Sequence, residues 1–381
     1  MQTVIATLMR PAGDTGVQTH FNTFRRWLDA EHRDALLVTP FDAPRWQFMP
    51  VFGLRLIVDR LSKPWSVWWY RRWHAFFLRR KLRTVLLSGA PAVVYAQCPL
   101  SARAALASRV SAAQRVVLAV HFNVSQAHEW SAKGMLAAHH FVFRQILEQE
   151  ADVLSRVDAL VFVSDFMRRE VFARVPAARD RPSTVIANFV DDPGDAEASQ
   201  PADDLLCIGT LEPRKNQHYL LEIIAAAKRL GTDLRVTLIG DGPDRQALEA
   251  RAVELGIRNL TSFAGRILGA SKSFASHRAC IHVASVENLP LTLIEALAHS
   301  RPIFACAAGG VPEVFDDGVE GRLLPLDDAN AAARIVLQWW SDSRRLESAG
   351  LAARKRFERD FDTRILAARL AAFLTAPQHD D

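Results

Sequence analysis

Short apolar runs alternate with amphipathic stretches along the whole chain. The first half carries runs rich in Val, Ile and Leu at residues 3–8, 35–40, 92–97, 116–122, 159–164 and 183–188. The second half carries them at 205–210, 235–242, 260–265, 279–285 and 302–308. Intervening stretches such as 216–230 and 243–255 have apolar residues at helical spacing. Continuous apolar strands separated by helices predict an α/β fold with parallel sheets covered on both faces.

The pattern is interrupted at residues 188–204, NFVDDPGDAEASQPADD, which are nearly free of large apolar groups. A chain of 381 residues is also too long for one ordinary core. We therefore expect two doubly wound, Rossmann-like domains, over 1–190 and 204–356, joined by a linker at 191–203. Two such domains are expected to face each other across a ligand cleft at the carboxyl ends of their strands.

Composition narrows the class of protein. The chain is 49% hydrophobic and 23% charged, with no apolar run long enough to span a membrane. The first residues lack the features of a signal peptide and are predicted to form a strand. The cysteines are scattered and form no C-x-x-C pair, which argues against a zinc site or a disulfide framework and predicts a cytoplasmic protein.

Two glutamates border the apolar segment ENLPLTLIEALAHSRP, residues 287–302. Pro290 is suited to the first turn of a helix, which places Glu287 in the preceding loop and Glu295 in the second turn. The free amides of Leu291 and Thr292 would then favour a phosphate, and the two carboxylates could accept hydrogen bonds from sugar hydroxyls. A solvent-facing loop acid and an ordinary helix acid remain the alternative.

Arg214 and Lys215 follow a strand and a glycine turn. A nucleotide-sugar diphosphate carries about two negative charges, and cleavage of the sugar bond adds charge to the leaving phosphate. Two cations at this position can stabilise that charge without a metal. The alternative is a solvated pair in a loop.

The ordered segments LCIGTLEPRKNQHYLLEII, VTLIGDGPDRQALE, LTSFAGRI and ENLPLTLIEALAHSRPIFACAAGGVPEVF resemble the retaining glycosyltransferases of family four, which have the GT-B fold. The resemblance is strong over residues 204–326. It is fainter in the first half, where it rests on TGVQTHF (15–21) and AVHFN (119–123).

The resemblance implies roles for residues of the second half. Glu287 would bind the hydroxyls of the donor hexose near the reacting centre, and Glu295 would bind the nucleotide ribose. The backbone at Arg266 and Ile267 would hold the base. The residues whose backbone would border the sugar and phosphates are Asn288, Leu289, Pro290 and Leu291.

Other positions are less clear-cut. Many relatives have an arginine where this chain has Thr210, and Arg214 could take over part of its role. In the first half, Gly16 would let the backbone approach the donor phosphate. His121 would bond the donor sugar or the acceptor, or simply be a satisfied polar group at the end of a strand. Gly240 and Gly242 are predicted to shape a tight strand-to-helix turn.

No catalytic metal and no cofactor other than the donor are expected. The one D-x-D sequence, Asp360–Asp362, precedes the last helix, and Asp362 or Thr363 is better interpreted as its cap. In GT-B enzymes the last helix commonly crosses back to the first domain, and residues 357–376 are predicted to do so.

One segment holds most of the excess charge. Residues 55–83 carry a net charge of +8, so the rest of the +5 chain sums to −3. At helical spacing Trp65, Trp69, Trp73 and Phe76 fall in one arc, with arginines within or beside it. Aromatic and cationic groups together suit an anionic membrane surface, and residues 65–83 are predicted to bind one. The alternatives are a helix packed on the first domain with outward arginines, and, less well supported, a nucleic-acid site.

These observations predict a retaining, metal-independent hexosyltransferase. It would move a sugar from GDP-mannose or a UDP-sugar to a glycan acceptor, expected to be lipid-linked, in the synthesis of surface polysaccharide. The expected location is the cytoplasmic face of the cell membrane. The alternatives are a non-catalytic nucleotide-sugar or glycan-binding protein of the same fold, a GT-B epimerase, and a synthase with a soluble acceptor.

Overall fold

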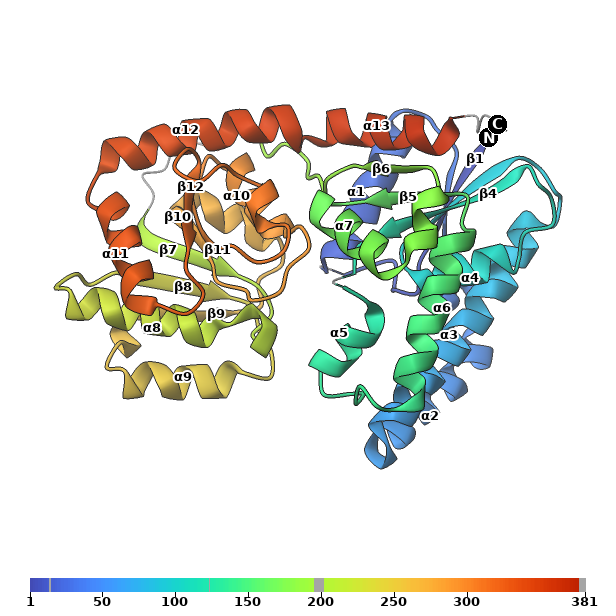
Figure 1. Cartoon of the computed structure of the whole chain (residues 1–381), viewed down its shortest axis with the longest axis horizontal. Helices are drawn as coiled ribbons and strands as arrows, with labels where there is room; N and C mark the ends of the chain where they lie inside the picture. Colours follow the sequence, from blue (N-terminus) through green and yellow to red (C-terminus); the bar gives the residue numbers. More distant parts are fainter. Residues whose placement is uncertain (14, 123, 195–201, 377–381) are drawn as a thin grey trace. The chain divides into compact units, whose positions relative to one another are not determined.

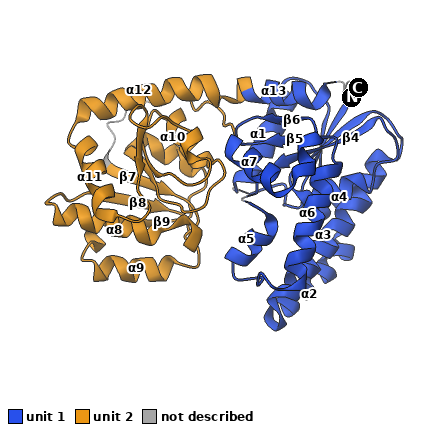
Figure 2. Cartoon of the chain, viewed as in Figure 1, with its two compact units in different colours: residues 1–187, 366–381 blue, residues 188–365 orange. Residues whose placement is uncertain are grey.

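The computed structural model describes residues 1–13, 15–122, 124–194 and 202–376. The chain forms two compact units, drawn in different colours in Figure 2. Unit 1 comprises residues 1–187 and 366–381, and unit 2 comprises residues 188–365. The first division lies within three residues of the predicted domain end at 190. Residues 195–201 of the predicted linker lie outside the described part of the chain.

Unit 1 contains a six-stranded sheet in the order β2-β1-β3-β4-β5-β6. Every neighbouring pair is parallel. The strands are β1 (Gln2–Ala6), β2 (Ala35–Val38), β3 (Ala92–Ala96), β4 (Gln114–Val120), β5 (Ala159–Phe162) and β6 (Ser183–Val185). All six correspond to predicted apolar runs. The apolar side chains of β1, β3, β4 and β5 are buried, and helices flank both faces of the sheet (Figure 1).

Helices connect the parallel strands of unit 1. They are α1 (Gly16–Ala30), α2 (Arg45–Leu61), α3 (Lys63–Leu86), α4 (Pro99–Leu106), α5 (Gln126–Ala132), α6 (Phe141–Arg156) and α7 (Asp165–Arg174), with short 3-10 turns η1 (Pro40–Asp42) and η2 (Pro176–Asp180). Helix α1 begins with a capping box in which Thr15 and Gln18 satisfy each other's backbone amides.

Unit 2 contains a second six-stranded parallel sheet, in the order β12-β11-β10-β7-β8-β9. Its strands are β7 (Ala202–Ile208), β8 (Arg235–Ile239), β9 (Thr261–Gly265), β10 (His277–His282), β11 (Ile303–Cys306) and β12 (Gly321–Leu324). The sequence pattern missed β12. This strand lies at the edge of the sheet and is only half apolar, so it has no continuous hydrophobic run to reveal it.

The helices of unit 2 are α8 (Gln217–Arg229), α9 (Arg245–Glu254), α10 (Leu291–Ala298), α11 (Ala329–Trp340) and α12 (Ser343–Asp360), with 3-10 turns η3 (Pro213–Lys215), η4 (Arg258–Leu260), η5 (Ala270–Ser276) and η6 (Val311–Glu313). The helices α8, α9 and α10 connect successive strands, and α11 and α12 follow the last strand, β12. The helices expected over 216–230 and 243–255 correspond to α8 and α9.

The end of the chain differs from the prediction. One helix was expected over 357–376, but residues 361 and 362 interrupt it, and α13 (Thr363–Thr375) starts afresh. Asp362 causes the new start, because its carboxylate accepts a hydrogen bond from the Arg364 amide at 2.7 Å. The interpretation of Asp362 as a cap is therefore confirmed. The chain returns to unit 1 from residue 366.

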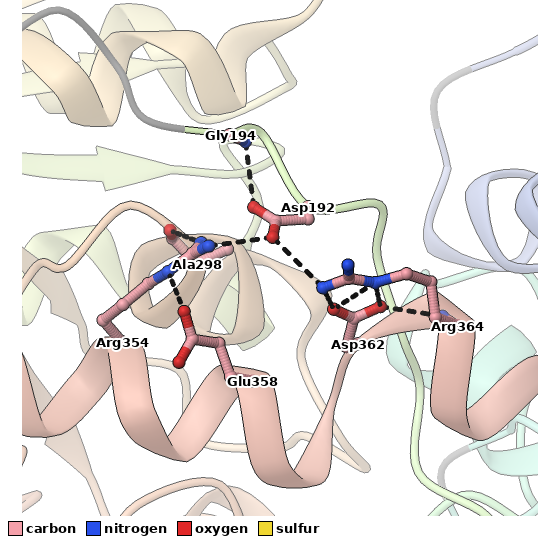
Figure 3. Close-up of polar contacts among 7 residues, drawn as sticks. All are labelled: Asp192, Gly194, Ala298, Arg354, Glu358, Asp362 and Arg364. Carbon is pink, nitrogen blue, oxygen red and sulfur yellow. Dashed lines mark hydrogen bonds and ion pairs between the residues drawn. The ribbon is translucent and has the colours of Figure 1, made fainter.

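A group of ion pairs surrounds this break (Figure 3). Arg354 donates to Asp192 at 2.8 Å, and Arg364 pairs with Asp362 at 2.5 Å and with Asp192 at 3.4 Å. The backbone of Val190 also bonds to Phe361 and Thr363. The segment that begins unit 2 and the segment that ends it are thus fastened side by side.

Helices α2 and α3 pack on each other, so that part of the predicted aromatic arc on α3 is covered. Trp69 donates its indole N–H to the Val51 carbonyl at 2.8 Å, and Trp73 is partly buried. Only Trp65 and Phe76, at the two ends of the arc, are about half exposed. The middle of the arc therefore follows the alternative of a helix packed on its own domain. In the described residues, no helix is both long and apolar enough to cross a membrane.

Candidate active site

The strand order of unit 2 reverses between β7 and β10, and parallel sheets bind ligands outside the carboxyl ends of their strands at such a point. The turn η3 follows β7, and the loop that carries Glu287 follows β10. The two loops are joined directly. Ser285 donates to the Arg214 carbonyl from its amide at 3.0 Å and from its hydroxyl at 3.2 Å.

The residues predicted for the donor meet at this point. Lys215 Nζ forms an ion pair with Glu287 Oε1. His282 Nε2 lies 3.2 Å from the same oxygen. Glu287 and His282 are buried, with 7% and 3% of their surface exposed. His282 was not predicted as a site residue, although a histidine that ends an apolar strand five residues before Glu287 is a visible signal.

The protonation states of Glu287 and His282 follow from their burial and their contacts. Burial alone would raise the pKa of Glu287, but the Lys215 ammonium and the hydrogen bond from His282 outweigh it and hold that pKa well below its ordinary value. Burial lowers the pKa of His282, more than its bond to Glu287 raises it. At neutral pH an ionised carboxylate therefore accepts from a neutral histidine, and because the carboxylate has no proton, we assign the histidine proton to Nε2.

Arg214 completes the cationic side of the site. Its Nη1 lies 3.9 Å from Glu287 Oε1, while its Nε pairs with Glu212 at 2.6 Å. Thr210, where relatives often have arginine, is exposed, and its carbonyl accepts from Gln217 at 3.0 Å. A guanidinium therefore stands beside the lysine even though residue 210 supplies none.

The start of α10 provides a second feature suited to an anion. Pro290 is the residue before the helix rather than a residue of its first turn, and it makes no side-chain cap. The first amides of α10, those of Leu291 and Thr292, are thus not capped by that side chain. The loop before α10 is held by the first residue of unit 2, since Asn188 donates to the Leu289 carbonyl at 2.7 Å. Asn188 was not predicted as a site residue; Asn288, which was, is buried.

Glu295 occupies the second turn of α10, as predicted. Its side chain is partly buried, and within the described residues no hydrogen bond to its carboxylate is found. Burial raises the pKa of Glu295 to about 7. A partly buried carboxyl group without a hydrogen bond to the described residues is suited to a ligand hydroxyl, which would supply that bond.

We expect Glu295→Gln to stabilise the protein in a pH-dependent way. The pKa of Glu295 is about 7 in the fold against 4.5 ordinarily, so the folded chain holds a proton that the unfolded chain releases. Stability therefore falls as pH rises between these values. Glutamine cannot ionise, so the variant should match the wild type near pH 5 and exceed it by about 2 kcal/mol at pH 8. Urea unfolding at both pH values checks this; an equal difference at both would contradict it.

The remaining predictions for unit 2 concern its loops. A Cβ on Gly240 would lie 1.9 Å from the Gly209 carbonyl oxygen, and one on Gly242 would lie 2.2 Å from that of Leu211. Both glycines therefore shape the turn after β8 against the turn after β7, as predicted. Arg266 and Ile267 follow β9 and are exposed. The structure does not join them to the group at Glu287, and their contact with the base stays a prediction.

In unit 1 the strand order reverses between β1 and β3. The predicted residues Gly16 and His121 come after β1 and β4, the two strands on either side of β3. Gly16 is the first residue of α1. His121 follows β4, and its Nε2 lies 3.2 Å from Gln97 Oε1. The buried ring of His20 packs edge-on against it, with ring centroids 4.6 Å apart. Burial lowers the pKa of His121 to about 4, so this histidine is neutral at pH 7.

Across the described ranges, no three side chains of His, Cys, Asp or Glu gather in a way that could hold a metal ion. The free thiols of Cys207, Cys280 and Cys306 are buried. Metal independence stays a prediction.

Family models match almost the whole chain. Residues 15–192 match the model described as Glycosyltransferase Family 4, and residues 193–356 match the model described as Glycosyl transferases group 1. The two matches meet close to the division between the two units. The chain is a family-4 glycosyltransferase.

Several proteins are similar to this glycosyltransferase. The GDP-mannose-dependent alpha-(1-6)-phosphatidylinositol monomannoside mannosyltransferase of Mycolicibacterium smegmatis is 28% identical over 305 residues, which are 74% of this chain and 75% of the relative. The D-inositol 3-phosphate glycosyltransferase of Saccharomonospora viridis is 32% identical over 215 residues, half of each chain. A putative colanic acid biosynthesis glycosyltransferase, WcaL of Escherichia coli, is 24% identical over 45% of each chain. The match thus reaches three quarters of the first relative and half or less of the other two.

Solved structures share the fold of this glycosyltransferase. Anabaena Alr3699/HepE in complex with UDP-glucose superposes with a TM-score of 0.69 at 17% identity, covering 98% of this chain and all of the other. Sucrose-phosphate synthase from Thermosynechococcus elongatus gives a TM-score of 0.73 at 16% identity, covering 98% of both chains. Both are GT-B proteins, so the predicted GT-B fold with two Rossmann-like domains is confirmed.

Proposed function

We propose that this glycosyltransferase is a retaining hexosyltransferase that moves a sugar from a nucleotide-diphosphate donor to a lipid-linked glycan acceptor during the synthesis of a surface polysaccharide or glycolipid. One observation carries the proposal. Arg214 and Lys215 lie beside the ionised Glu287 at the strand-order reversal of unit 2. Cations suited to a diphosphate and an acid suited to sugar hydroxyls are therefore adjacent.

The donor diphosphate is placed between the two cations and the open amides of α10, since both favour negative charge. The ribose is assigned to Glu295, and the hexose to Glu287. The donor is GDP-mannose or a UDP-sugar. A relative named for GDP-mannose and a structural neighbour solved with UDP-glucose each support one of them.

In the proposed reaction the bond from the anomeric carbon to the donor phosphate breaks, and a bond from that carbon to the acceptor oxygen forms on the same face. The leaving phosphate oxygen takes the proton of the acceptor hydroxyl, so no protein base is required. Lys215 and Arg214 stabilise the charge that gathers on the phosphate. Glu287, held ionised, stabilises positive charge on the sugar ring. We favour this route over a covalent glycosyl-enzyme.

The lipid-linked acceptor and a location at the cytoplasmic face of the membrane are part of the same proposal. Relatives named for phosphatidylinositol monomannoside and for phosphatidyl-myo-inositol support the first, and the basic α2–α3 region supports the second.

The test is the release of UDP or GDP from a panel of nucleotide sugars, with a lipid extract as the source of acceptor. One donor is expected to give release that depends on the extract, to be unchanged by EDTA, and to yield a product with the anomeric configuration of the donor by NMR. Donor binding that raises Tm without any release would indicate a binding protein instead. Interconversion of the donor sugar without acceptor would indicate an epimerase.

A further inference from the structure

The helix α2 exposes an apolar face that no part of the proposed reaction uses. Its large apolar side chains that point to solvent are Trp46, Met49, Leu54, Leu56, Ile57 and Leu61. At 3.6 residues per turn they fall in an arc of about 160°. Leu61 is 80% exposed, Trp46 75% and Leu56 71%. A surface helix of a soluble domain normally turns such a stripe toward its core, so this helix has the opposite orientation.

The charge of α2 and α3 is mostly positive. Asp59 is the only acid of α2 and α3, and it is paired with Lys63 at 2.6 Å. On α3 a surface groove is lined by the exposed side chains Arg79, Arg80 and Arg83 together with Phe76, Thr84 and Leu87. Arg80 also donates to Gln47 of α2 at 3.2 Å, so the groove and α2 belong to one surface. Figure 1 shows the two helices side by side along the outer part of unit 1.

We infer that the exposed face of α2 inserts into the interface of an anionic lipid bilayer, with the arginine groove of α3 holding lipid phosphates. Apolar side chains beside cations fit this partner, because the apolar groups leave water while the guanidinium groups bind headgroups. A second copy of the chain fits less well, since two such surfaces would bring their cations together without acids to pair them. The proposed membrane contact therefore lies mainly on α2, and not on the aromatic arc of α3, whose middle is covered by α2.

The test compares sedimentation of the full chain with vesicles of phosphatidylglycerol mixed with phosphatidylcholine and with vesicles of phosphatidylcholine alone. Leu56→Ser/Ile57→Ser/Leu61→Ser should reduce the partition coefficient on anionic vesicles at least about tenfold. Leu230→Ser/Val253→Ser/Leu351→Ser is the matched control, since these residues of unit 2 are 49%, 63% and 62% exposed; it should bind as the wild type does.

Equal binding of the α2 variant and the wild type would overturn the inference. So would a wild type that stays in the supernatant with both vesicles, or a wild-type dimer in solution that the α2 variant dissociates. Nucleotide release with a water-soluble acceptor does not depend on this surface, so failure of the membrane contact and failure of the proposed reaction are separate results.

A second observation, in the first sheet, concerns the tautomer of His121. Gln97 is buried and its amide orientation is set, since Nε2 donates to the Tyr95 carbonyl at 3.3 Å. Its Oε1 therefore faces His121 Nε2 and can only accept. His121 must donate from Nε2, which leaves Nδ1 as an acceptor. Within the described part of the chain Nδ1 makes no hydrogen bond, and the ring is partly exposed.

We propose that Gln97 is a positioning residue that holds His121 with Nδ1 ready to accept a hydrogen bond from a substrate hydroxyl. This rests on the proposed function and on the predicted contact of His121 with the donor sugar or the acceptor. His20 supports the other side of the ring, and its own Nε2 lies 3.2 Å from the Tyr95 hydroxyl. The backbone of Gln97 is fixed as well, because its amide donates to the Ala6 carbonyl of β1 at 2.9 Å.

Gln97→Met removes the acceptor at similar size and should lower kcat/KM about tenfold, but should cause no further loss in a His121→Ala background. Gln97→Glu places a carboxylate beside the ring and favours the imidazolium. It should add an acid limb to the pH–rate profile between about pH 5 and 8, where the wild type is expected to be flat because the pKa of His121 is about 4.

A wild-type profile for Gln97→Glu, or an equal loss from Gln97→Met in both backgrounds, would overturn the proposal. Full activity of His121→Ala would overturn the role of His121 and of Gln97 with it. The transfer reaction itself would stand in that case, because nucleotide release would still be observed.

Discussion

Glu287→Gln is expected to lower kcat by two to three orders of magnitude, on the scale of removing one preorganised charge from a reacting centre. The variant keeps the size of the side chain and can still accept from His282, but it removes the negative charge that Lys215 and His282 maintain in the buried site. The KM for the donor should change much less, because the charge matters most when the sugar bond is breaking.

Steady-state release of UDP or GDP measures this effect, with Tm recorded in parallel to exclude unfolding. Glu222→Gln is the matched control, since Glu222 is also an ion-paired glutamate of unit 2 but bonds Arg251 at the surface. It should retain wild-type kcat. A Glu287→Gln enzyme with unchanged kcat on the same donor would remove Glu287 from the reaction.

Lys215→Met is expected to weaken both the fold and the reaction. Glu287 would remain buried without its main partner, and breaking a buried pair on one side costs roughly 3–5 kcal/mol. The loss should be largest at pH 7 and smaller near pH 4. In the wild type the depressed pKa of Glu287 contributes stability that is complete above its ordinary value of 4.5 and is lost only as pH falls through the folded value, well below pH 4. In the variant, burial without the lysine raises the pKa of Glu287, so the carboxylate takes up a proton near pH 4 and the unpaired charge is removed. Urea unfolding at both pH values measures it.

The double variant Lys215→Met/Glu287→Gln separates the two effects of the lysine. Removing the carboxylate as well as the ammonium leaves no buried charge unpaired, so much of the stability should return. Activity should stay low, because the leaving phosphate has lost a cation and the sugar has lost its acid. Recovery of activity along with stability would show that Lys215 serves only the fold.

The surface of unit 1 shows where a one-dimensional pattern is insufficient. The arc of Trp65, Trp69, Trp73 and Phe76 was correctly placed on one side of a helix, but the sequence could not tell which neighbour that side would meet. In the structure α2 covers the middle of the arc, and α2 exposes apolar residues of its own. A helical period gives the direction of a side chain relative to its helix axis, not the identity of what lies opposite.

The site of unit 2 was more predictable for a physical reason. Successive parallel strands end at the same edge of a sheet, so residues that follow them are brought to one side by topology alone. Arg214 and Lys215 after β7 and Glu287 after β10 therefore lie at the same edge of the sheet. The same argument did not reach His282, because a histidine inside an apolar run was attributed to the strand, or Asn188, which approaches from the start of the unit.

By itself, the sequence determined two parallel α/β sheets and the loops that carry the predicted donor site, because these follow from local periodicity and from the fixed direction of parallel strands. The tertiary structure alone decided which side chains form hydrogen bonds and ion pairs with each other. Lys215 and Glu287 pair although 72 positions separate them, and Gln97 meets His121 across two strands. Such contacts depend on side chains from distant segments meeting within a few ångströms, and neither periodicity nor spacing specifies that.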